Sequence, residues 1–130
     1  MLRNVKHLVP LTGALVLALT APALLAGSGE AQSGPVRCDV LATSDGGMVT
    51  LEGVVHAEMP TSGSYVFRVR SVGGSSDTSI NQGGDFSAGP GQPARVGEVT
   101  LGGSGAIFDA TLDVETPEGR LSCSERAGVL

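Results

Sequence analysis

Apolar and polar residues alternate strictly along residues 64–72, which read Ser-Tyr-Val-Phe-Arg-Val-Arg-Ser-Val. Tyr65, Phe67 and Val69 occupy one row of this segment, and the opposite row contains Arg68 and Arg70. Successive side chains of a β-strand leave the backbone on opposite faces, so this period of two predicts a half-buried strand. One of its faces is expected to form core, and the other places two cations side by side.

The same alternation recurs in short segments that are separated by Gly, Ser, Asp and Pro. Regularly spaced short strands with turn residues between them are typical of a β-sandwich or barrel, so the sequence predicts an all-β fold. We expect the last residues, 127–130, to fray. The other strands are predicted at residues 36–41, 48–59, 95–101, 106–115 and 120–125, with two short strands near 78–82 and 85–88.

Within residues 48–59 the alternation places Val54 and His56 on the outer row. Gly53 falls on the inner row, where a glycine indicates a bulge or a closely approaching neighbour. Regularity is weaker between residues 73 and 91, and Ile80 and Phe86 are the apolar residues expected to fix that part to the core.

The first 31 residues have the pattern of a secretory signal peptide. Arg3 and Lys6 precede an apolar stretch over residues 8–25, and small residues offer cleavage sites after Ala26 or after Ala31. A membrane anchor is the alternative, but prolines, glycine and threonine interrupt the apolar stretch and no basic segment follows it. The sequence therefore predicts an exported protein whose single domain covers residues 32–130.

After the predicted signal peptide the chain is acidic. It contains six arginines, no lysine and twelve acidic residues, which gives a net charge of −6. Nucleic acids and anionic membrane surfaces bind proteins through basic patches, so this balance argues against both as partners. Any local group of arginines is conspicuous in such a chain.

Cys38 and Cys123 are the only cysteines, in the first and the last predicted strands. In an oxidising compartment they are expected to form a structural disulfide. The bond would close a loop of about 85 residues, which the chain-entropy model values at roughly 4 kcal/mol. Two free buried thiols or a redox pair are the alternatives, although redox catalysis usually uses a Cys-x-x-Cys motif that is absent here.

We find no pattern that predicts catalysis or a cofactor. The glycine-rich turns lack the helix and lysine of a phosphate loop, and His56 is the only histidine after the signal segment. Asp109, Asp113 and Glu115 could form a loose calcium site with Glu118, but a solvated acidic face is the simpler interpretation. Without a nucleophile and base that could work together, the chain is not expected to be an enzyme.

Arg68 and Arg70 have two interpretations. They can pair with acidic side chains on neighbouring strands, which stabilises a sheet modestly. Alternatively, they can recognise an acidic or polar partner, and the sequence leaves both possibilities open.

Several motifs resemble those of the CsgH family of curli-type amyloid-assembly chaperones from Gram-negative bacteria. The most specific is the Ile-Asn-Gln-Gly-Gly-Asp-Phe run at residues 80–86. It is accompanied by Leu-Glu-Gly-Val-Val-His-Ala at 51–57, Gly-Ser-Tyr at 63–65, Val-Thr-Leu-Gly at 99–102 and Cys-Ser-Glu at 123–125. The likeness spans nearly all of the chain after the signal segment.

The resemblance implies one immunoglobulin-like antiparallel β-sandwich of about seven strands in the periplasm. It implies a monomeric protein without cofactors that binds curli-type amyloid subunits and inhibits their premature fibre formation. The related CsgC proteins have a Cys-x-Cys motif that is absent here, so no redox role follows. Arg68 and Arg70 become the candidate client-binding residues, and the alternative is that an edge strand pairs with the client by β-augmentation. The alternative function is an exported β-sandwich module that binds carbohydrate or another surface ligand.

Overall fold

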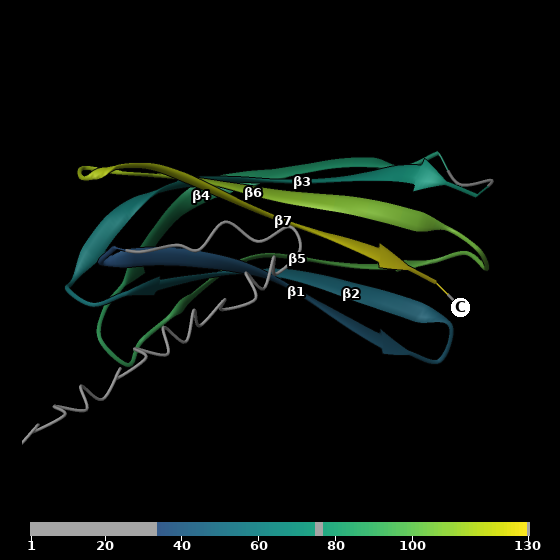
Figure 1. Cartoon of the computed structure of the whole chain (residues 1–130), viewed down its shortest axis with the longest axis horizontal. Coiled ribbons are helices and arrows are strands. Elements are labelled where there is room, and N and C mark those ends of the chain that lie inside the picture. The colour runs from purple at the N-terminus through teal and green to yellow at the C-terminus, as the bar shows by residue number, and fades with distance from the viewer. Residues whose placement is uncertain (1–33, 75–76, 130) are drawn as a thin grey trace, which may run out of the picture. The chain divides into compact units, whose positions relative to one another are not determined.

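Seven antiparallel strands form two sheets in the computed structural model, which describes residues 34–74 and 77–129 (Figure 1). The predicted signal peptide therefore lies outside the described residues. Residues 31–130 form one compact unit. The strands are β1 (Val36–Asp45), β2 (Met48–Ala57), β3 (Thr61–Gly73), β4 (Ser79–Ala88), β5 (Ala94–Gly102), β6 (Ile107–Thr116) and β7 (Gly119–Gly128).

The strand order is β1-β2-β5 in one sheet and β4-β3-β6-β7 in the other. An immunoglobulin constant domain pairs its fourth strand with the fifth. Here β4 instead pairs with β3, so the fourth strand belongs to the opposite sheet. This arrangement confirms the prediction of an all-β, immunoglobulin-like sandwich. Within the described residues no helix is long and apolar enough to cross a membrane.

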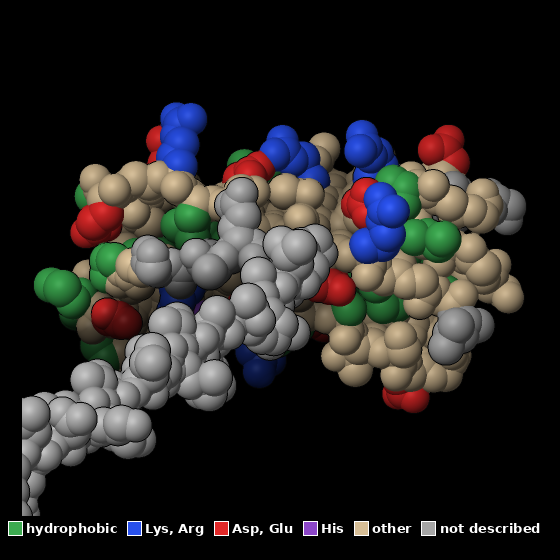
Figure 2. Space-filling model, in the orientation of Figure 1, with side chains coloured by type: hydrophobic (Ala, Val, Ile, Leu, Met, Phe, Trp, Pro, Cys, Tyr) green, Lys and Arg blue, Asp and Glu red, His purple; other side chains and the backbone are tan. Residues whose placement is uncertain are grey.

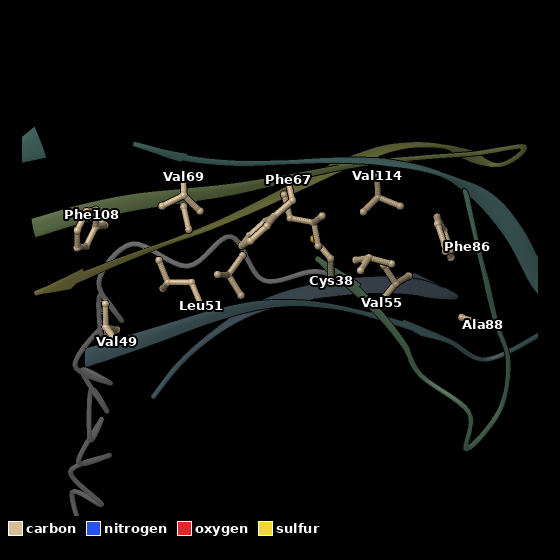
Figure 3. Packing of buried hydrophobic residues seen from close by; sticks show 14 of the residues in the cluster. Cys38, Val49, Leu51, Val55, Phe67, Val69, Phe86, Ala88, Phe108 and Val114 are labelled. Atoms are coloured by element: carbon tan, nitrogen blue, oxygen red, sulfur yellow. The ribbon is translucent and has the colours of Figure 1, made fainter. Parts of the chain in front are cut away.

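The core lies between the two sheets and consists of the inward rows that the alternation predicts (Figure 3). Phe67, Phe108, Leu51 and Leu112 are its largest fully buried side chains. Burying an aliphatic or aromatic side chain of this size contributes about 1.5–3 kcal/mol to folding, so these inward rows hold the sheets together. In β3 the outward row, including Arg68 and Arg70, is exposed.

A β-bulge lies where β5 passes Gly53, and it brings the Val96 backbone so close that a Cβ atom on Gly53 would lie 2.6 Å from the Val96 carbonyl oxygen. The bulge also explains why Val96 is buried, although strict alternation would place it on the outer row. Only Gly53 separates Glu52 from Val54, whereas two residues separate their partners Glu98 and Arg95 in β5. The extra residue therefore lies in β5, where Gly97 has a φ of 93°. The bulge changes the phase of β5 and turns Val96 into the core.

Three details differ from the sequence predictions. The two short strands near 78–82 and 85–88 are one continuous strand, β4. The C-terminal end is ordered as far as Val129 and does not fray there. The Val129 amide donates a hydrogen bond to the Ala106 carbonyl at 2.8 Å, and the Val129 carbonyl accepts one from the Gly105 amide. Val54 does lie on the outer row, opposite Asp39 and Arg95, but it is buried.

Two side-chain contacts lie in the outer row beside the outward Val54. His56 lies 3.2 Å from Asp39, and Arg95 lies 3.4 Å from Glu52. These four side chains belong to the same outer row or to adjacent positions on β1 and β5. Their aliphatic parts can cover a small apolar side chain while the charged groups stay in water.

A disulfide joins Cys38 of β1 to Cys123 of β7, whose Cα atoms lie 6.0 Å apart. These strands are outermost in different sheets, so the bond connects the sheets along one side of the sandwich. Cys38 is completely buried and Cys123 packs against the core. Because both cysteines are in this bond, the structure contains the expected structural disulfide and not the alternative of two free thiols.

Candidate functional site

The outer face of the four-stranded sheet carries four of the six arginines that follow the signal segment. Blue side chains line the top of the molecule in Figure 2, where Figure 1 places this sheet. Strand β6 lies between β3 and β7, so its carboxylates separate two arginines on each side. We call this surface the arginine face; it consists of Arg68, Arg70, Asp109, Asp113, Glu115, Arg120 and Arg126.

On the β7 side of the arginine face the charges are paired. Arg126 donates two hydrogen bonds to Asp109, from Nε at 2.6 Å and from Nη2 at 2.9 Å. These bonds, together with the positive charges of Arg126 and Arg70, hold the pKa of Asp109 below its usual value against the opposing effect of burial. The same contact raises the pKa of Arg126. Arg120 donates to Glu115 at 3.2 Å.

Arg68 is also paired, with Asp113 on the neighbouring strand β6. The other carboxylate oxygen of Asp113 accepts a hydrogen bond from Ser122 at 2.8 Å. The interpretation that Arg68 pairs with a neighbouring acid therefore applies. A paired guanidinium has less charge to offer a partner, so the two candidate arginines are not equivalent.

Arg70 forms no ion pair with any residue in the described part of the chain. In register it faces Asp109, but that carboxylate is already bound by Arg126. The side chain of Arg70 borders a polar hollow on the sheet surface, which is lined also by Arg68, Ser79, Asn81, Asp109 and Thr111. The guanidinium, hydroxyl and amide groups are donors that can bind a carboxylate of a partner. The Asp109 carboxylate would oppose such a partner less than a free acid would, because Arg126 already binds it.

Valines extend the exposed row of β3 on both sides of the arginines. Val66 and Val72 are 42 % and 41 % exposed. The row therefore presents an apolar residue, two cations and a second apolar residue in succession. An extended segment with apolar and acidic side chains would be complementary to this row, since both types of contact repeat every second residue.

Sequence reasoning found Arg68 and Arg70 but missed Arg120 and Arg126. The sequence contained enough information to find Arg120. A short turn joins the predicted strands at 106–115 and 120–125, and pairing them as a hairpin places Arg120 opposite Glu115. Asp109, Asp113 and Glu115 are not an unpaired acidic face, since each contacts an arginine. Among the residues that the structure describes, no group of three could hold a metal ion.

Comparison with known proteins assigns the family. The family model described as CsgH protein matches residues 37–126. The solution structure of R. palustris CsgH has 37 % sequence identity to this chain and a TM-score of 0.59, and the match covers 68 % of this chain and 89 % of that one. The E. coli curli protein CsgC has 18 % identity and a TM-score of 0.54, covering 70 % and 96 %, and supports the fold alone. No curated protein matches. The chain therefore belongs to the CsgH family.

Proposed function

We propose that this protein is a periplasmic chaperone that binds curli-type amyloid subunits and inhibits their premature fibre formation. Its CsgH family membership and its likeness in fold to a curli protein support this role. The predicted signal peptide supports export to the periplasm. We further propose that the chaperone works as a monomer without a cofactor and has no stable membrane association.

The observation that carries the proposal is the exposed arginine row of β3, and Arg70 in particular. Amyloid subunits associate through extended segments that stack by backbone hydrogen bonds. A charged sheet face can meet such a segment transiently, because charge complementarity increases the rate of encounter more than the final affinity. Arg70 has no carboxylate partner among the described residues, so it can bind a client carboxylate without first breaking an internal ion pair.

The alternative, a carbohydrate-binding module, has less support. Such modules usually present an aromatic platform to the sugar. Phe67, Phe86 and Phe108 are buried, and Tyr65 packs against the core. The sequence contains no other Phe or Tyr and no Trp.

Fibre growth of a curli-type subunit, followed by dye fluorescence, tests the proposal. The wild type is expected to prolong the lag phase. Arg70→Glu should shorten that lag and so should the double change Arg68→Glu/Arg70→Glu, and added salt should weaken the wild type. Arg37→Glu is the matched control, because Arg37 is exposed on the opposite sheet and forms no ion pair with the described residues.

Two results would separate the parts of this proposal. If the wild type fails to delay fibre growth, the chaperone function is wrong. If the wild type delays growth but Arg70→Glu and the double variant do so equally well, the function stands and the arginine row is not the client site. Equal losses in Arg70→Glu and Arg37→Glu would indicate an effect of net charge alone.

A further inference from the structure

A polar side chain occupies an inward position at one side of the sandwich. Gln82 lies opposite Phe67 in the β3–β4 register, and Phe67 is fully buried. The inward row of β4 also contains Ile80 and Phe86, so an apolar residue would be the ordinary choice at Gln82. Strand β4 is outermost in its sheet, and from this edge the side chain of Gln82 reaches the other sheet.

The amide of Gln82 forms two hydrogen bonds with the backbone of a single residue on β5. Its Nε2 donates to the Glu98 carbonyl at 3.3 Å, and its Oε1 accepts from the Glu98 amide at 3.2 Å. A residue in an antiparallel strand directs both of its backbone groups to the same side. The groups of Glu98 therefore point away from β2 and towards the open edge of β5, where Gln82 binds both.

The sequence of β5 makes room for this contact. A Cβ atom on Gly97 would lie 2.7 Å from a ring carbon of Phe67 and 3.0 Å from Oε1 of Gln82. Gly97 also has a positive φ, which other residues adopt at a cost. The bulge at Gly97 thus sets Glu98 in place and leaves the space that the Gln82 side chain needs.

The position of Glu98 matters for strand addition. It is the central residue of β5, which runs from Ala94 to Gly102, and β5 is an outermost strand. An incoming extended strand would need the outward amide and carbonyl of Glu98 to continue its hydrogen bonds across the edge. We infer that Gln82 is an edge latch, which occupies these two groups and prevents an extended chain from adding to β5.

The opposite side of the sandwich is restrained in another way. There the disulfide between Cys38 and Cys123 brings the outermost strands β1 and β7 to a Cα separation of 6.0 Å. Each side of the sandwich thus contains a contact between an outermost strand of one sheet and an outermost strand of the other. The latch does not depend on the identity of any client, so it can be tested on the purified protein alone.

The test compares Gln82→Met with the wild type. Methionine keeps the length and bulk of the side chain and removes both hydrogen bonds. We expect the Glu98 amide to exchange with deuterium about three- to tenfold faster, the range that corresponds to one lost hydrogen bond. The Val99 amide points towards β2 and should not change, which makes it an internal reference. Gln92→Met is the matched control, because Gln92 is an exposed loop residue.

The second measurement is self-association, followed by size-exclusion chromatography with light scattering over a concentration series. The Gln82→Met protein should form dimers at concentrations where wild type and Gln92→Met remain monomeric. Unchanged exchange at Glu98 would show that the latch does not exist. Faster exchange without any dimer at the highest concentration would show that the latch does not guard the edge. Circular dichroism establishes that the variant is folded before either result is interpreted.

Discussion

Breaking the disulfide between Cys38 and Cys123 should remove a large part of the stability of this domain. The bond closes a loop with a sequence separation of 85, and the chain-entropy relation gives about 4.5 kcal/mol at 25 °C for that length. Domains of this kind are stable by about 5–15 kcal/mol in total. The reduced protein should therefore remain folded only marginally.

Urea unfolding of the oxidised and reduced protein measures this effect. With a slope of about 1–2 kcal/mol per molar urea, the midpoint should fall by about 2 M or more on reduction. The double variant Cys38→Ala/Cys123→Ala is the control for effects of the reductant, because reductant should not change its midpoint. A loss of less than about 1 kcal/mol on reduction would refute the reasoning, since it would mean that the loop is already restrained in the unfolded chain.

Two further predictions concern packing and charge. Gly53→Ala should lower the free energy of unfolding by about 1–3 kcal/mol in urea titrations. The new Cβ atom would lie 2.6 Å from the backbone oxygen of Val96 and would force the strands apart. Stability equal to the wild type would show that β5 can shift without cost. Asp109→Asn should lower the melting temperature at pH 7 but not at strongly acidic pH. The folded pKa of Asp109 lies below its value in the unfolded chain, so its contribution is present above the unfolded pKa of about 4 and is lost as the pH falls through the folded pKa. A melting-temperature difference that stays constant from pH 7 to pH 2 would contradict this assignment.

Alternation was enough to predict which rows of most strands form the core. Phe67 and Val69 of β3 are buried as the period of two requires, and so are Phe108 and Leu112 of β6. Such rows are legible because each strand is regular and has one apolar face. The same rule fails for Val96, since the bulge at Gly97 changes the phase within β5 and nothing in the local sequence fixes where the extra residue lies.

Contacts between distant strands were less accessible to sequence reasoning. Val54 is buried although it lies on the outer row, and its neighbours across the sheet, Asp39 and Arg95, belong to β1 and β5. The order of the C-terminal end depends on backbone bonds between Val129 and the turn before β6. Predicting either feature requires the order of the strands in the two sheets, and the local alternation of residues does not give that order.

The candidate site was predicted in part for the same reason. Arg68 and Arg70 stand out in an acidic chain, and their shared face follows from their spacing. That Arg68 is paired and Arg70 is not follows only from the register with β6, where Arg126 on the far side already binds Asp109. The distinction makes Arg70 the sharper target for mutation.

The link between the first strand and the last also sets an order of events in synthesis. Of the seven strands, β1 leaves the ribosome first and β7 last. The bond from Cys38 therefore cannot form until Cys123 has been made. No truncated product that ends before Cys123 can form this bond. Oxidation of the pair therefore requires that β7 has been made, and its appearance in pulse-labelling experiments would time the joining of β1 to β7.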